Sequence, residues 1–194
     1  MITKQINLDH FFPTPIWSCK LDHFNHNSIK KWILNKSKKV KGRSLSNYKG
    51  WQSDLIFNNK TFNPLIKEIY NVVLSLNLKI KKLSMPQLWC SVNNKNNFNM
   101  IHNHGQFDLS GCYYIETPKD CGSIAFRDPR PGALINYNFY RVFSGAEMKS
   151  IDIEPKTLIV FPSFLDHLVW PNESNFPRIS INFDIKVDEY TEKL

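Results

Sequence analysis

The sequence predicts a mainly β protein with N-terminal helices and a jelly-roll core. After Pro86 the chain becomes a series of short segments rich in β-branched and aromatic residues, and Pro, Gly, Asn or Asp separates most of them. Several short strands in a row, without helices between them, indicate a sandwich or barrel, and a double-sheet jelly roll fits best. The predicted strands are QLWCSVN, LSGCYYIE, SIAFR, LINYNFYRV, MKSIDIE, TLIVF, HLVW and RISINFDIKV.

Two helices are expected ahead of these strands. Ser28 can cap a helix that runs to about Val40. A stronger helix begins at Asn63-Pro64, because proline is favoured in the first turn of a helix. Apolar residues then recur at steps of three and four positions, which is helical spacing. These apolar residues are Leu65, Ile66, Ile69, Val72, Val73 and Leu76.

A single domain is predicted over residues 1–194, because neither an internal repeat nor a linker divides the chain. Residues 1–85 would form a helical support part and residues 86–187 the jelly-roll core. Residues 1–25 are expected to be an extended lead-in, since the two prolines of FFPTPIW exclude a helix there.

Composition excludes several classes of protein. The chain is 42% hydrophobic and 13% aromatic, which is typical of a globular rather than a disordered protein. Neither an apolar run long enough to cross a membrane nor a signal peptide is evident, so no membrane partner is expected. The four cysteines lack CxxC spacing, which favours free thiols in a cytoplasmic protein over a zinc finger.

The net charge of +8 is unevenly distributed. Residues 1–83 hold 15 Lys and Arg against 4 Asp and Glu, whereas the remainder holds 10 against 13. The basic part could bind an anionic partner, or its lysines could belong to a solvated surface rich in Lys and Asn. Nucleic acid is not expected as a partner, because no recognised binding motif accompanies the lysines. A homodimer is left open.

Two histidines, His102 and His104, precede the predicted strand LSGCYYIE. In an extended strand residues i and i+2 point the same way, so both imidazoles can converge on one metal ion. His167, in FPSFLDHLVWP, is the third candidate ligand. Isolated histidines are more often surface or core residues. An HxH pair with a later histidine, and with Arg178 eleven residues beyond it, favours a metal site.

Taken together, His102-Asn103-His104, LSGCYYI, TLIVFPSFLDH and PRISINFDI resemble the iron(II)/2-oxoglutarate-dependent oxygenases, and more narrowly a bacterial and phage branch of them. A GWQS-like segment (Gly50 to Ser53) and a DPR element (Asp128 to Arg130) add to the resemblance, which covers roughly residues 12 to 185. It implies a double-stranded β-helix (jelly roll) core with helices packed outside. It also implies a dioxygenase that uses Fe(II), 2-oxoglutarate and dioxygen to hydroxylate an unidentified substrate, releasing succinate and carbon dioxide.

The resemblance further implies where 2-oxoglutarate binds. Its keto acid end chelates the iron, and a cation deeper in the barrel binds its far carboxylate, for which a guanidinium is well suited. Arg178 follows His167 in the order that the family uses, and Ser180 lies two residues later on the same strand face. Tyr114 could donate a hydroxyl to the same carboxylate, with Tyr113 as the alternative. Arg178 could instead be a surface residue at a strand edge.

One position departs from the family pattern. Most members have HxD, so His104 stands where a carboxylate is usual. Three neutral imidazoles leave the iron site one unit more positive, which would change its potential, loosen the iron or mark a site that has drifted from catalysis. Asp108 is a reserve ligand, although Gly105 suggests that the strand bends away before it. We favour His102, His104 and His167.

Two other functions are considered. One is a cupin-like metal-binding protein without 2-oxoglutarate chemistry, which would not need a guanidinium such as that of Arg178 or its neighbour Ser180. The other is a binding module that uses the basic N-terminal surface on an anionic partner. The fold does not choose the substrate of an oxygenase, and a protein or amino-acid side chain is the class considered. Candidates for the cavity entrance are Trp51, Trp89, Arg127, Arg130 and Tyr137.

Overall fold

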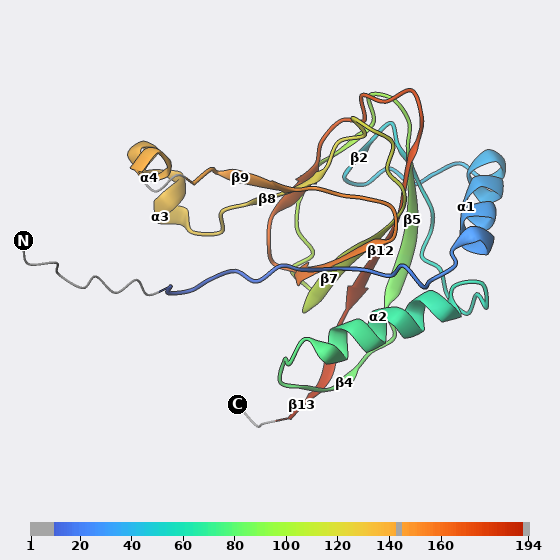
Figure 1. The fold of residues 1–194 in the computed structure, drawn as a ribbon, viewed down its shortest axis with the longest axis horizontal. Helices are drawn as coiled ribbons and strands as arrows, with labels where there is room; N and C mark the ends of the chain where they lie inside the picture. Colours follow the sequence, from blue (N-terminus) through green and yellow to red (C-terminus); the bar gives the residue numbers. More distant parts are fainter. Residues whose placement is uncertain (1–9, 143–144, 192–194) are drawn as a thin grey trace, which may run out of the picture.

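The computed structural model describes residues 10–142 and 145–191 (Figure 1). Within this part, the larger of two antiparallel sheets has six strands in the order β1-β10-β7-β12-β5-β3. Their order interleaves distant parts of the chain, so that β7 and β5 flank β12. The strands are β1 (Trp17–Lys20), β3 (Trp51–Gln52), β5 (Gln87–Asn93), β7 (Leu109–Glu116), β10 (Thr157–Pro162) and β12 (Arg178–Ile185).

The smaller sheet has the order β2-β6-β11-β8-β9 among the described residues, and all its pairs are antiparallel. Its strands are β2 (Asn47–Tyr48), β6 (Phe98–His102), β8 (Ile124–Arg127), β9 (Met148–Ile151) and β11 (His167–Val169). A separate ribbon pairs β4 (Ile80–Leu83) with β13 (Val187–Tyr190). The predicted jelly roll with N-terminal helices is confirmed.

Two helices, α1 (Asn27–Lys39) and α2 (Asn63–Ser75), pack on the outer face of the larger sheet. Each has one buried apolar side, as the periodicity predicts. The buried helix residues are Ile29, Ile33, Leu65, Ile69 and Val73. This large core leaves the inner face of the sheet free to line a cavity.

Strand β12 shows the division between the two faces most clearly. Successive side chains of a strand point to opposite sides. Its apolar residues join the core beneath the helices: Ile179, Ile181, Phe183 and Ile185. Its polar residues line a cavity between the sheets: Arg178, Ser180, Asn182 and Asp184.

The segment LINYNFYRV is not a strand, so that prediction was wrong. It forms parts of two short helices, α3 (Pro131–Leu134) and α4 (Tyr137–Val142), beyond the ends of β8 and β9 (Figure 1). Pro131 stands in the first turn of α3, where its fixed φ favours a helix. Ile135 is 88% exposed, so its β-branched side chain lies on the surface and packs on no sheet.

The N-terminal part differs from expectation in two details. Helix α1 begins one residue before Ser28, and His26 at the N-cap makes no side-chain capping hydrogen bond. The expected extended lead-in contains β1, which pairs with β10, while residues 1–9 lie outside the described residues. Strands β2 and β3 also come from this part. β2 pairs with β6 of the smaller sheet, and β3 pairs with β5 of the larger sheet. The single-domain assignment stays a prediction.

Candidate metal and co-substrate site

Three histidines from separate places in the chain meet at one end of the cavity. His102, His104 and His167 each offer a ring nitrogen, and these nitrogens lie within 4.8 Å of one another. The ring centroids of His102 and His167 are 4.3 Å apart, and that of His104 lies 5.1 and 5.3 Å from them. The structure therefore brings together the three ligands expected from the sequence.

Strand pairing accounts for this convergence. His102 ends β6 and is paired directly with His167, the first residue of β11. His104 lies just beyond β6, where its backbone N–H donates to the carbonyl of Ser163 at 2.8 Å. The HxH pair therefore spans a strand end, and the backbone contact rather than a continuous strand directs His104 toward the other two rings.

The Nδ1 atom of each histidine faces an oxygen acceptor. His102 Nδ1 lies 2.7 Å from the carbonyl oxygen of Met100, and His167 Nδ1 lies 2.9 Å from that of Leu165. His104 Nδ1 lies 2.6 Å from a carboxylate oxygen, Asp184 Oδ1. These oxygens carry no proton to give, so Nδ1–H is the donor and the lone pair remains on Nε2. Histidines that bind metals are commonly oriented in this way, so the set suits a divalent ion.

Burial keeps two of these rings neutral. It lowers the pKa of His102, and it lowers that of His167 to about 3, with nearby His102 adding to the effect. Neutral imidazole is the form that binds a metal, because a protonated ring has no free lone pair. Neither of these two rings therefore has to lose a proton before it can bind a metal at neutral pH.

The free energy of unfolding of the metal-free protein should fall as the pH drops below about 6.5. The folded-state pKa values of His26, His102 and His167 lie below the 6.5 of a free histidine, mainly through burial. The unfolded chain therefore binds more protons as the solution is acidified, and the stabilisation present above pH 6.5 is progressively lost toward pH 3. Each group can contribute a slope of up to about 1.4 kcal/mol per pH unit.

Urea unfolding in a chelator between pH 7.5 and 5 measures this slope. His167→Asn removes one of the titrating groups and should give a shallower dependence than the wild type. An unchanged slope would contradict the buried, neutral state of His167.

Asp108, the reserve ligand, is not brought to the group. It is exposed, and its Oδ2 accepts the backbone N–H of Val187 at 2.8 Å. The carboxylate that does contact the triad is that of Asp184, which the sequence prediction did not include.

The cavity has a volume of about 460 Å³ and also holds the residues expected to bind 2-oxoglutarate. Arg178 is 2% exposed, and its Nη1 donates to the carbonyls of Cys121, Gly122 and Trp170. Its Nη2 has no hydrogen-bond partner, and Arg178 forms no ion pair among the described residues. Burial lowers the pKa of Arg178, although a guanidinium stays charged at neutral pH. A buried cation without an ionic partner on the cavity wall is well suited to a carboxylate ligand. Because β12 lies within the sheet rather than at its edge, Arg178 is not a surface residue at a strand edge.

Ser180 and Tyr114 line the same cavity, whereas Tyr113 does not. Burial raises the pKa of Tyr114 well above its ordinary value, so its hydroxyl keeps a proton to donate. Tyr113 points to the helical side, where its hydroxyl lies 2.9 Å from His26 Nδ1. The alternation of β7 thus places Tyr114, and not Tyr113, on the cavity side.

Of the five candidates for the entrance, Trp89 lines the cavity, with its ring 5.6 Å from that of His104. The side chain of Tyr137 lies outside the described residues. Trp51 donates its indole N–H to the carbonyl of Val40 at 2.9 Å and does not line the cavity.

The two remaining candidates, Arg127 and Arg130, form ion pairs close to the start of the segment that contains α3 and α4. Arg127 pairs with Glu147 at 2.8 Å and Arg130 with Asp128 at 2.6 Å. The DPR element therefore forms a local ion pair, which also lowers the pKa of Asp128 through the hydrogen bond from Arg130.

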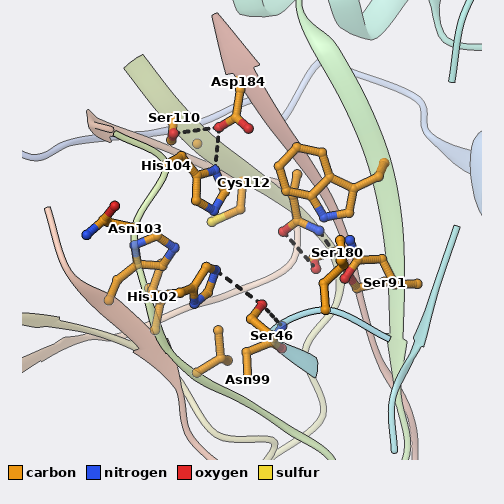
Figure 2. Close-up of a pocket in the computed structure, with 18 of the residues that line it drawn as sticks. Ser46, Ser91, Asn99, His102, Asn103, His104, Ser110, Cys112, Ser180 and Asp184 are labelled. Carbon is orange, nitrogen blue, oxygen red and sulfur yellow. Dashed lines mark hydrogen bonds and ion pairs between the residues drawn. The ribbon is translucent and has the colours of Figure 1, made fainter. Parts of the chain in front are cut away.

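Residues that sequence reasoning missed complete the histidine end of the cavity (Figure 2). The Oγ of Ser46 lies 3.3 Å from Nε2 of His102, and Asn99 donates to the same hydroxyl. Ser46 comes from the loop before β2, where no sequence signal marks it. Asp184 had a signal, because the spacing that puts Ser180 on the face of Arg178 also puts Asp184 there.

Together these features define a class of protein: a jelly roll whose interior brings together three histidines that could hold a metal ion and a buried guanidinium that could bind an acidic co-substrate. The chain belongs to the 2OG-Fe(II) oxygenase family, since the model of the family described as "Putative 2OG-Fe(II) oxygenase" matches residues 87–184. The protein is therefore an Fe(II)- and 2-oxoglutarate-dependent dioxygenase with dioxygen as second co-substrate, as the resemblance implied. Its primary substrate is unidentified.

Solved structures share the fold at low sequence identity. A Pseudomonas putida prolyl-4-hydroxylase matches with a TM-score of 0.63 and 11% identity over 91% of this chain and 94% of that chain. A viral collagen prolyl hydroxylase from Paramecium Bursaria Chlorella virus-1, in its 2OG complex, gives 0.59 and 14% over 88% and 94%. HygX from Streptomyces hygroscopicus, with nickel and 2-oxoglutarate bound, gives 0.63 and 11% over 93% and 86%.

Two further findings bear on the sequence predictions. No curated protein sequence matches the chain. Among the described residues no helix combines the length and apolar character needed to cross a bilayer.

Proposed function

We propose that this oxygenase binds its iron through His102, His104 and His167, and its 2-oxoglutarate through Arg178 with Ser180 and Tyr114. One observation carries the proposal. Three imidazoles, each anchored through Nδ1, share a cavity with a buried guanidinium that has a free Nη2. A cupin-like site would need the first group but not the second.

When bound, Fe(II) and 2-oxoglutarate supply the oxidising chemistry that hydroxylates a C–H bond; the chain supplies binding, orientation and exclusion of water. The three carbonyls on Nη1 hold the guanidinium of Arg178 in place, and Nη2, which has no hydrogen-bond partner, is left to bind the far carboxylate. The apolar side chains of Ile124, Phe161 and Val169 line the same cavity and would help to exclude water from it.

Turnover can be tested without the primary substrate, since oxygenases of this kind slowly decarboxylate 2-oxoglutarate alone. Anaerobic addition of Fe(II) and 2-oxoglutarate should give a weak visible charge-transfer band, and admitting oxygen should then yield succinate slowly. His104→Ala should show neither signal above the protein-free control. Metal binding by the wild type without the band or succinate would instead favour the cupin-like alternative.

We propose a protein or amino-acid side chain as the primary substrate. The support is the likeness to proteins described as prolyl hydroxylases, together with a cavity wall of Trp89, Ser91 and Asn182 that offers an aromatic face and hydrogen bonds to a neutral group. A homodimer, a cytoplasmic location and an anionic partner for the basic N-terminal surface also remain proposals. Light scattering, cell fractionation and salt-dependent binding assays, respectively, test them.

A further inference from the structure

Asp184 lies beside His104 in a buried group of hydrogen-bonded side chains. Asp184 is 6% exposed, and its Oδ1 lies 2.6 Å from Nδ1 of His104. Ser110 donates its hydroxyl to the same oxygen at 2.5 Å, and the Ser110 Oγ lies 2.8 Å from that of Ser163. Figure 2 shows the contacts of Asp184 with Ser110 and with His104.

A buried carboxylate is costly unless it is paired. Among the described residues no Lys or Arg forms an ion pair with Asp184, and its one charged or chargeable partner is the ring of His104. The carboxylate therefore acts mainly on that ring. Burying it costs free energy that a neutral side chain in a purely structural role would not cost.

The position of the charge agrees with the unusual ligand set. With His104 in place of the usual carboxylate, three neutral imidazoles leave the site one unit more positive than two imidazoles and a carboxylate. A carboxylate hydrogen-bonded to the far nitrogen of a ligating imidazole fixes its orientation and makes it a stronger base. The carboxylate missing from the metal's own ligands is thus found one imidazole further out.

We propose that Asp184 is a positioning residue that acts through His104, orienting the ring and returning to the site the negative charge that the HxH sequence removes. This inference rests on the proposed function of His104 as a ligand. Ser110 supports it by holding the carboxylate in place.

The test measures the dissociation constant for Mn(II) of the wild type and of Asp184→Asn. The amide keeps the shape but not the charge, and we expect metal binding about 10- to 100-fold weaker, the range usual for such partners of metal-binding histidines. Ser110→Ala should weaken it less, and gives a second variant should Asp184→Asn fold poorly. Asp166→Asn is the matched control, because Asp166 lies beside His167 but its carboxylate accepts a hydrogen bond from Asn103 rather than from a triad ring. It should change the affinity less than about threefold.

A double-mutant cycle separates action through His104 from a general effect of charge or folding. In a His104→Asp background no imidazole remains for Asp184 to orient. Asp184→Asn should therefore weaken Mn(II) binding much less in that background than in the wild type. The absorption spectrum of bound Co(II) should also shift in Asp184→Asn, since the field of one ligand changes.

Equal Mn(II) affinity of the wild type and Asp184→Asn would overturn this inference alone, as would equal losses in both backgrounds. A wild type that binds no metal would instead overturn the proposed function, so the two failures are distinguishable.

Discussion

His167→Ala should abolish stoichiometric binding of Fe(II) or its Mn(II) surrogate, weakening it by more than about 100-fold. His167 is 5% exposed and pairs directly with His102 on the neighbouring strand β6, which holds its ring against that of His102. The same loss is expected for His102→Ala and His104→Ala. Metal content after dialysis, with circular dichroism to verify the fold, gives the measurement.

His23→Ala is the matched control. His23 is exposed and pairs with Glu68 of α2, away from the cavity, so its loss should leave metal content unchanged. Equal metal content in the wild type and all three triad variants would end the metal assignment. Metal retained by His104→Ala but lost by Asp108→Ala would make Asp108 the third ligand.

Arg178→Met should remove the stabilisation of the metal-loaded protein by 2-oxoglutarate while leaving metal binding in place. In the wild type, millimolar 2-oxoglutarate should raise Tm, because a ligand that binds the native state stabilises it. Loss of a charge-assisted hydrogen bond from Nη2 should weaken the affinity by about 10- to 100-fold, which corresponds to roughly 1.5–3 kcal/mol.

The quantity to compare is the change in Tm on adding ligand. Arg178→Met also removes the donor that Nη1 provides to the carbonyls of Cys121, Gly122 and Trp170, which should lower the Tm of the variant itself. Arg130→Met, at an exposed arginine paired with Asp128, should keep the full shift, and acetate should not reproduce it in the wild type. An undiminished shift in Arg178→Met would contradict the assignment.

Much of the fold follows from local pattern. The β-branched and aromatic content of β5, β7, β10 and β12, with turn residues between most segments, locates these strands to within a residue or two of their bounds. Each of them has an apolar face against the helices. The short strands β2 and β3 carry no such pattern, since a strand of two residues depends on its partner rather than on its own sequence. LINYNFYRV misled because its β-branched residues Ile135 and Val142 lie at the surface, where packing does not select a strand.

The residues that the structure brings together were predictable where their sequence spacing or order was informative. His102 and His104 lie two positions apart, and His167 was added as a later histidine eleven residues before an arginine. The role of Arg178 with Ser180 came from the family resemblance. The contacts of Ser46 with His102 and of Ser110 with Asp184 join residues more than 50 positions apart. Such contacts depend on strand order, which one sequence does not reveal.

Strand β1 covers a side of β10 that would otherwise be an open edge of the larger sheet. Unpaired N–H and C=O groups along an edge are a template for pairing with another chain, and residues 158–161 of β10 are all apolar. β1 is only four residues long, and the exposed Lys20 near its end is a charge of the kind that discourages intermolecular strand pairing. The segment that was predicted as an extended lead-in thus covers an apolar strand that would otherwise present an open edge to other chains.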